Sequence, residues 1–330
     1  VELNTIASSF GCLSARVSAM HRHLSLSSPG AALPDNKSQR IVAGGLLAAH
    51  RLFCASERAL PAVVVMVVQP GESNSIDQRS LEHELGRSGV RVLRRTLGEL
   101  AAFGLEGGDF VLPDDGGARV AASVVYYRAG YTPDDYPGEP QWAARAALEE
   151  SSAVKCPDVF AHLFGAKKVQ QALATPELRK LCGSDEEEEG ARGLMTGLWP
   201  LGEEGDGGTV EMALADPGGY VLKPQREGGG NNLYGEEMVA ALRRMSRDER
   251  AAYILMRLIT PDVFHNVLVR NGAIAYSGDC VCELGVFSAS LGEEDLFEGE
   301  GGFILRCKAK ETLEGGVAAG YAFLSSPELV

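Results

Sequence analysis

The uninterrupted apolar run at residues 62–68 limits the possible folds more than any other part of the sequence. Its length suits a β-strand, and a strand that is apolar on both faces is typical of a parallel sheet covered by helices. Helical spacing precedes the run at residues 37–60 and follows it at 77–86, and residues 90–93 are again strand-like. The sequence therefore predicts a small α/β domain over residues 61–165.

Antiparallel pairing is expected further along the chain. Asn271-Gly272 separates two apolar stretches at 264–270 and 273–281, which is a strong hairpin signal. A second hairpin turn is predicted at 114–117, between strands 110–112 and 120–127. The remaining elements predicted from periodicity are helices at 141–151, 167–182 and 235–245 and strands at 220–222 and 252–259. Residues 183–209, which contain the acidic run 186–189, are interpreted as a solvated loop.

Charge and composition narrow the possible partners. The chain has 45 acidic and 31 basic residues, a formal charge of −14, and no run of five basic residues. Such a chain repels nucleic acid and anionic membranes, so neither is an expected partner. No apolar run approaches the roughly 18 residues that a membrane span needs. The chain begins Val1-Glu2 without an initiator Met, so we expect the natural protein to have a preceding segment, which could have carried organellar targeting.

The seven cysteines are an odd, scattered set, which fits reduced thiols in a cytosol-like compartment. Cys280 and Cys282 would point to the same face of a strand. A zinc site would need a second close pair, which the sequence lacks, so buried structural thiols are the better interpretation.

Residues 223–232 are the part of the sequence that most strongly indicates ligand binding. Three consecutive glycines allow backbone amides to surround phosphate oxygens, while Lys223 and Arg226 add positive charge and Glu227 offers an oxygen ligand for Mg²⁺. The segment lacks the Gly-Lys-Ser/Thr ending of a Walker A loop. A flexible glycine turn is the alternative interpretation.

This segment resembles the glycine-rich loop of eukaryotic glutathione synthetases. Further matches to that family follow in its order along the chain: residues 1–10, Asp77-Gln-Arg79, and the stretches at 127–131, 155–158, 167–171 and 315–320. The resemblance implies an α/β (α+β) ATP-grasp fold. It implies a catalytic domain at 1–60 and 166–330 and an inserted α/β substrate-binding domain at 61–165.

The resemblance also implies roles for individual residues. The implied magnesium ligands are Glu2, Asn4 and Glu227. The implied ATP contacts are Lys167, Lys223, Glu227, Gly228, Gly229, Gly230, Asn231, Asn232, Tyr234, Met256, Arg257, Leu258, Ile259, Glu283, Lys308 and Glu314. The implied substrate contacts are Ser9, Glu72, Asn74, Gln78, Arg128, Tyr131, Arg306, Val317 and Ala318. Catalysis is expected from Arg306, Lys223 and the three glycines 228–230.

The activity that the resemblance implies is ATP- and Mg²⁺-dependent ligation of γ-L-glutamyl-L-cysteine to glycine through an acyl phosphate, giving glutathione, ADP and phosphate. A cytoplasmic homodimer is expected. The alternatives are an ATP-grasp ligase with another amine acceptor, such as β-alanine, and a truncated, non-catalytic nucleotide-binding remnant. The sequence departs from the family at Ala7, where Ser is frequent, at Arg257, which replaces an acidic residue, and at Glu314, which replaces Asp.

Overall fold

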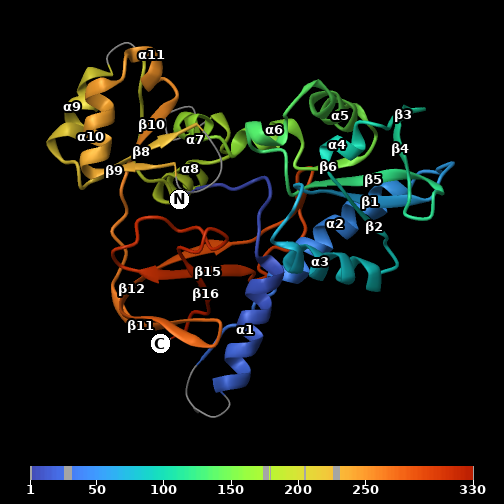
Figure 1. Cartoon of the computed structure of the whole chain (residues 1–330), viewed down its shortest axis with the longest axis horizontal. Coiled ribbons are helices and arrows are strands. Elements are labelled where there is room, and N and C mark those ends of the chain that lie inside the picture. Colours follow the sequence, from blue (N-terminus) through green and yellow to red (C-terminus); the bar gives the residue numbers. More distant parts are fainter. Residues whose placement is uncertain are drawn as a thin grey trace. The chain divides into compact units, whose positions relative to one another are not determined.

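The computed structural model describes residues 2–25, 32–173, 178, 180–203, 206–225 and 231–329. The chain forms two compact units (Figure 1). The first unit combines Val1–Thr5 with Val159–Pro261, and the second combines Ile6–Asp158 with Asp262–Val330. Each unit is therefore built from stretches that are distant in sequence.

The larger sheet of the second unit is mainly parallel. Its strands are β2 (Val92–Arg95), β1 (Ala62–Val67), β5 (Arg119–Tyr127), β4 (Asp109–Pro113) and β3 (Gly104–Glu106) in that order, with β6 (Val154–Cys156) also beside β5. Strand β1 pairs in parallel with β2 and β5. Strands β3 and β4 add an antiparallel edge. This confirms the strand, the parallel pairing and the α/β arrangement that the apolar run predicted.

Helices cover both faces of this sheet (Figure 1). Val64 and Met66 pack with α1 (Gly11–Ser25), α2 (Ser38–Cys54) and α3 (Ser75–Arg87) in one hydrophobic cluster. Val63 and Val65 point to the opposite face, into a second cluster that includes residues of α4 (Leu97–Leu100) and α5 (Glu139–Glu150). Since successive residues of a strand alternate between faces, burial on both sides explains why the run is apolar at every position. A short 3-10 helix spans Pro133–Asp135.

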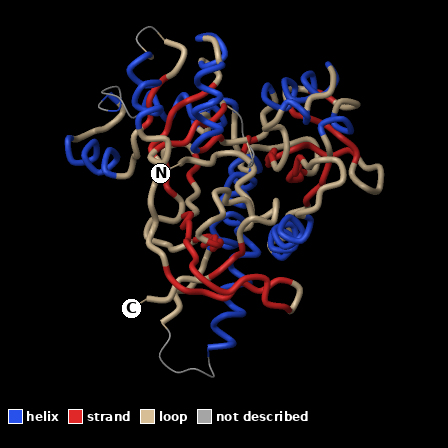
Figure 2. The backbone as a smooth tube through the Cα atoms, turned by 60° about the vertical axis from the view of Figure 1, so that its left-hand side comes forward, coloured by secondary structure: helices blue, strands red, loops and turns tan. Residues whose placement is uncertain are grey.

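The second unit also holds an antiparallel sheet of β11 (Phe264–Arg270), β12 (Ala273–Val286), β15 (Phe303–Ala309) and β16 (Phe323–Ser325), in that order. The predicted hairpin turn is confirmed: Asn271 and Gly272 both have positive φ, as a two-residue turn of this type requires. Strand β12 is longer than expected. Helix α1 lies along this sheet (Figure 2), where the Ser14 hydroxyl donates to the carbonyl oxygen of Phe303 at 2.7 Å. Strands β13 (Ser290–Leu291) and β14 (Glu294–Asp295) form a small ribbon.

The first unit is built on a four-stranded antiparallel sheet. Its order is β7 (Leu198–Pro200), β10 (Tyr253–Arg257), β8 (Tyr220–Pro224) and β9 (Leu233–Tyr234). Its hydrophobic core joins Leu222 and Leu255 of this sheet to residues of α9 (Gly207–Ala215) and α10 (Gly235–Arg244). The unit also contains α6 (Val159–Phe164), α7 (Lys167–Leu173), α8 (Asp185–Gly193) and α11 (Arg247–Arg250).

The prediction of a loop over residues 183–209 is wrong. Helix α8 begins after Ser184, whose hydroxyl accepts a hydrogen bond from the amide of Glu187 at 3.2 Å. Asp185 and the first three residues of the run, Glu186–Glu188, occupy its first turn, where the positive end of the helix dipole stabilises carboxylates. Strand β7 and the start of α9 also lie in this stretch. The helix predicted at 167–182 ends at Leu173, and residues 174–177 and 179 of it lie outside the described residues.

The two compact units divide the chain differently from the expected domains, because residues 6–60 join 61–158 in one unit. The assignment of a catalytic domain to 1–60 and 166–330, and of a substrate domain to 61–165, remains a prediction. Within the described parts of the chain, no helix is both long and apolar enough to span a bilayer.

Candidate functional site

A charged cluster in the first unit joins the start of the chain to α7 and β8. The Glu2 carboxylate forms an ion pair with the Lys167 ammonium and lies 3.8 Å from that of Lys223. The Gln170 side chain fixes the backbone beside Glu2, since it accepts from the Leu3 amide at 3.3 Å and donates to the Leu3 carbonyl at 3.0 Å. Two lysines and a carboxylate meet here, which suits a phosphate group with its metal ion.

The donor chemistry fits the predicted magnesium site as far as it is described. Glu2 supplies a carboxylate and Asn4 an amide oxygen, and both residues are exposed. Mg²⁺ prefers such oxygen ligands and keeps several waters. Of the other predicted residues, Glu227 and the three glycines at 228–230 lie outside the described residues, as does Arg226.

The two ends of the glycine-rich segment are anchored in the sheet. On one side, the Gln225 amide donates to the Ala252 carbonyl at 2.8 Å and its side chain accepts from the Lys168 amide at 2.9 Å. On the other side, the Asn232 amide group donates to the Tyr234 hydroxyl at 3.3 Å. Strand β9 pairs antiparallel with β8, so the segment is the connection of a hairpin. Asn231 lies in the same connection.

The predicted adenine segment, 256–259, begins in β10 and continues for two residues beyond its end at Arg257. Met256 is buried, whereas Ile259 is 60% exposed. The amides of Arg257 and Leu258 donate to the carbonyl oxygens of Gly197 and Gly219 at 2.8 and 2.9 Å. These two amides are therefore already engaged by the first unit's own backbone. A small pocket lined by residues 192 and 195–199 adjoins this segment, because Leu198 pairs with Met256.

The second unit brings together three of the predicted site residues, Glu283, Arg306 and Lys308, which are called the trio below. Glu283 on β12 lies opposite Arg306 on β15 in the sheet register. Its carboxylate is 3.1 Å from the Arg306 guanidinium and 2.7 Å from the Lys308 ammonium. Lys308 is buried, and it also donates to the Leu313 carbonyl at 2.9 Å. The Arg306 Nε is buried and has no hydrogen-bond partner among the described atoms.

The glycine loop that follows β15 packs directly against this trio. A Cβ on Gly315 would lie 2.4 Å from a Glu283 carboxylate oxygen, so a larger residue here would displace the loop or the Glu283 side chain. The loop is held by backbone bonds, among them one from the Gly320 amide to the Val317 carbonyl at 3.0 Å. Val317 is partly buried, whereas Ala318 is exposed. The structure thus places the loop that begins at Glu314 beside Glu283.

A second arginine of this unit is deeply buried. The Arg128 guanidinium lies 3.3 Å from the Asp77 carboxylate and donates to the Ser9 hydroxyl at 2.7 Å. Asp77 also accepts from three amides at the start of α1, those of residues 10, 12 and 13, at 3.0–3.2 Å. Burial alone would lower the pKa of Arg128, but Tyr126 and Asp77 raise it above the usual value. Positive φ angles at Ala7 and Phe10 flank Ser9, so this stretch is strained.

The other predicted substrate residues form a polar group nearby in the same unit. Glu72 accepts from the Gln78 side chain at 2.7 Å and from the Asn74 amide at 2.7 Å. Burial, and next the Asp135 carboxylate, raises the pKa of Tyr131, whose surroundings also include Glu72 and Arg128. These contributions place Tyr131 within electrostatic range of both.

Four residues of this region were missed from the sequence: Gln69, Asp77, Arg94 and Asp135. Arg94 donates to the Gln78 side chain at 2.6 Å, and Gln69 donates to the Tyr131 hydroxyl at 3.3 Å. Asp77 stood in a motif that carried the family resemblance, but nothing marked it as the partner of Arg128. The contact of Arg94 depends on the pairing of β1 with β2, which no local pattern reveals.

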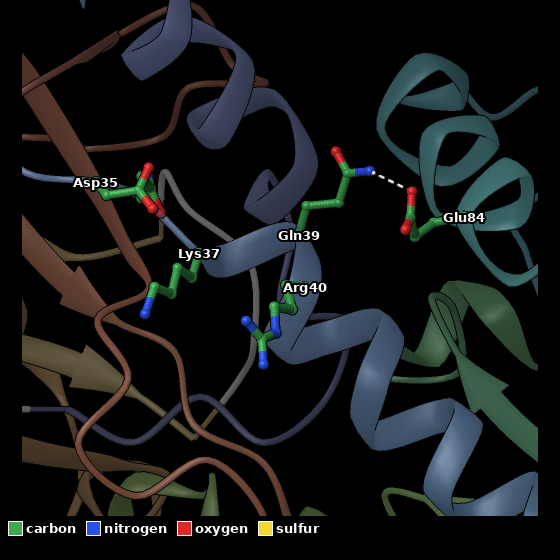
Figure 3. A pocket seen from close by; sticks show the side chains of 6 residues that line it. Asp35, Lys37, Gln39, Arg40 and Glu84 are labelled. Carbon is green, nitrogen blue, oxygen red and sulfur yellow. Dashed lines mark hydrogen bonds between the residues drawn. The ribbon is translucent and has the colours of Figure 1, made fainter.

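A pocket at the start of α2 contains none of the predicted site residues (Figure 3). It is lined by Asp35, Asn36, Lys37, Gln39, Arg40 and Glu84. The Gln39 amide group donates to Glu84 at 3.2 Å across it. Its charges are mixed, and Arg40 is paired with Glu300 at 3.0 Å. We therefore place the candidate site at the clusters described above.

Comparison with known proteins assigns the class. The family model described as "Eukaryotic glutathione synthase, ATP binding domain" matches residues 1–329. The chain is accordingly an ATP-dependent ligase of mixed α/β architecture, as the family resemblance implied. Glutathione synthetase of Homo sapiens is 42% identical, over 99% of this chain and 69% of the human protein. The chain belongs to the eukaryotic glutathione synthase family.

Further similarities agree with this family. The chloroplastic glutathione synthetase of Solanum lycopersicum is 40% identical over 100% of this chain and 61% of its own length. A glutathione synthetase-like effector of Globodera pallida has a solved structure that covers 100% of this chain and 70% of its own. Its TM-score is 0.71 at 20% identity, which shows a shared fold.

Proposed function

We propose that this chain joins γ-L-glutamyl-L-cysteine to glycine, with ATP converted to ADP and phosphate. The observation that carries the proposal is the convergence of Lys167 and Lys223 on Glu2. A carboxylate does not condense with an amine in water, so the reaction needs an activated acid. Transfer of the γ-phosphoryl group to the cysteinyl carboxylate gives an acyl phosphate, which the glycine amine attacks with loss of phosphate.

The first unit supplies the groups for the triphosphate. Lys167 is buried, and Lys223 lies beside the glycine-rich connection, and both ammonium groups are proposed to stabilise phosphate charge. Gly228, Gly229 and Gly230 are proposed to add backbone amides. Glu2, Asn4 and Glu227 would hold Mg²⁺, which neutralises phosphate charge. The purine is proposed to lie at the end of β10, near Met256 and Ile259.

The second unit supplies groups for the reacting carboxylate and the ribose. The Arg306 side chain is partly exposed and its Nε has no partner among the described residues, so its guanidinium has a donor left for a substrate carboxylate. Glu283 and Lys308 are proposed to contact the nucleotide. The loop that starts at Gly315 is proposed to cover the acyl phosphate, because this intermediate hydrolyses when water enters.

Arg128 is proposed to bind the γ-glutamyl end of the dipeptide. Its guanidinium is fixed by Asp77 and Ser9, and a fixed arginine fork suits a carboxylate. Glu72 carries the charge that an α-amino group of the substrate requires. Gln78, Asn74 and Tyr131 complete the polar group around it. This set accounts for both charged groups of a γ-glutamyl moiety.

The amine acceptor is proposed to be glycine. In relatives that take β-alanine, the resemblance places the difference at the alanine pair of the glycine loop, which is Ala318-Ala319 here. We expect turnover with glycine to exceed that with β-alanine, and equal turnover would contradict this choice.

The deciding measurement is ADP release from Mg-ATP, with the dipeptide and glycine each omitted in turn. Release that requires both substrates supports the ligase. ATP binding without release would favour the non-catalytic alternative. A Lys223→Met variant should lose release, whereas Lys168→Met, which removes the partner of the exposed Glu203, is the matched control.

A cytoplasmic homodimer is proposed as the working state. None of the seven cysteines, all of which lie within the described residues, forms a disulfide, which agrees with a reducing compartment. Light scattering on the purified chain would test the dimer.

A further inference from the structure

Helix α2 ends in a thiol and an imidazole that lie one turn apart. His50 and Cys54 are four residues apart, so they share one face of the helix. The Cys54 Sγ lies 3.6 Å from the His50 Nε2. All seven cysteines fall within the described residues, and Cys54 is the one classed as exposed. The most accessible thiol of the chain is therefore also the one beside an imidazole nitrogen.

The neighbouring strands fix the tautomer of His50. The buried Ser123 hydroxyl donates to the Val63 carbonyl at 2.9 Å, and this bond uses its single hydrogen. The 2.7 Å contact between the Ser123 Oγ and the His50 Nδ1 must then be donated by the histidine. With its hydrogen on Nδ1, the neutral ring presents the lone pair of Nε2 to Cys54. Burial, and next the charge of Arg51, lowers the pKa of His50, so this neutral form prevails at neutral pH.

The helix itself does not activate the thiol. Cys54 is the last residue of α2, where the negative end of the helix dipole disfavours a thiolate. Reactivity at this position therefore depends on a base that removes the thiol proton as the sulfur attacks. His50 is that base by position and by tautomer.

Four of the other thiols are less reactive than an exposed thiol because burial disfavours their thiolate forms. Burial raises the pKa of Cys12 to about 12 and that of Cys156 to about 11. Burial, followed by the neighbouring Cys307, raises the pKa of Cys280 to about 11 and that of Cys282 to about 12. Thiols of this kind supply almost no thiolate at neutral pH.

We propose that Cys54 is a modification site for small disulfides, with His50 as its general base. The His50 Nε2 takes the proton while the Cys54 sulfur attacks one sulfur of the disulfide. The S–S bond of the reagent breaks, and the departing sulfur takes the proton from His50. One thiol and one disulfide become a mixed disulfide and a new thiol, with no other oxidant. The adjacent Arg51 charge favours disulfides that carry carboxylates, such as glutathione disulfide.

The test follows thiol reaction of the intact chain with two probes, an aromatic dicarboxylate disulfide and glutathione disulfide. The modified residue is located by peptide mass mapping. We expect one fast thiol at pH 7, located at Cys54, with one glutathionyl group added by the second probe. Cys54→Ser should remove the fast phase, and Cys182→Ser is the control that should leave it unchanged.

His50→Gln separates the proposal from simple exposure. It should slow the reaction at pH 7 by about tenfold or more, because general-base assistance is lost. The difference should shrink at higher pH, where hydroxide can remove the proton in place of the imidazole. An unchanged rate at pH 7 would overturn the proposal, as would a fast thiol located at Cys182 or a failure of glutathione disulfide to react. No outcome depends on ligase activity, because none of these residues belongs to the candidate site.

Discussion

Two arginine–carboxylate pairs of the second unit have the same chemistry in opposite surroundings. The side chains of Arg128 and Asp77 are 4% and 3% exposed, whereas those of Arg306 and Glu283 are 37% and 36% exposed. Asp77 is also bound by three amides of α1, so this pair joins a helix to a sheet. Glu283 instead shares its carboxylate with Lys308.

The difference indicates different roles. A buried pair cannot lose one member without leaving an unpaired charge in a medium of low polarity, so it fixes geometry. A partly exposed pair contributes less to stability, and Arg306 can exchange its partner for a ligand at a smaller cost. We infer that Arg128 is held rigidly for binding, while Arg306 is available to change partners during the reaction.

Asp77→Asn should produce the largest effect. It leaves the Arg128 charge buried without its counterion and weakens the start of α1, so we expect a loss of about 3 kcal/mol or more in unfolding free energy. Urea denaturation followed by circular dichroism measures this loss. Asp115→Asn removes the exposed partner of Arg95 and should change stability by less than about 0.5 kcal/mol. Equal effects of the two variants would remove the distinction between the pairs.

Glu283→Gln should reduce turnover more than it reduces stability. Its pair with Arg306 is partly exposed, but its carboxylate is also the counterion of the buried Lys308, so we expect a loss of about 1–2 kcal/mol, smaller than that of Asp77→Asn. Turnover should fall by about tenfold or more, because the carboxylate that organises Arg306 and Lys308 has lost its charge. Steady-state ADP release, with KM for ATP measured separately, checks this expectation. A large loss of stability with normal turnover would place Glu283 among the structural pairs.

Gly315→Ala tests the pair of Arg306 and Glu283 by disturbing the loop that packs against it. The new Cβ would come 2.4 Å from a Glu283 oxygen, so the loop or the carboxylate must move. We expect turnover to fall about tenfold with a stability cost of about 1 kcal/mol. Gly301→Ala, where a Cβ meets nothing within 4 Å, is the matched control. Normal turnover in the Gly315 variant would show that the loop position is unimportant.

The sequence predicted most of the fold where one physical cause dominated. The run at 62–68 had to be buried on both faces, and Asn271-Gly272 had to accept positive φ. Helix α8 was not predicted because its acidic run was interpreted as part of a solvated loop. Its capping signal, Ser184 followed by Glu187, was present in the sequence.

Less of the candidate site than of the fold could be predicted from the sequence. Glu2 is more than 160 residues from Lys167, so their contact follows from the tertiary fold, and the family resemblance was the route to it. Asp135 bonds the backbone of its own loop at 130–132, whereas the ties of Asp77 to the start of α1 depend on how the chain closes over the sheet. Short-range patterns carry no information about such closures.

The smallest expected effect comes from an ion pair in the first unit. Arg250 hydrogen-bonds Asp206, and this bond, followed by the Gly202 amide, lowers the pKa of the carboxyl. Because the folded pKa lies below the unfolded one, the stabilisation is present above pH ~4 and is lost as the pH falls through the folded pKa. Asp206→Asn should cost about 1 kcal/mol or less at pH 7 and nothing near pH 2. A cost that persists in acid, measured by urea denaturation at both pH values, would show that packing rather than charge holds Asp206.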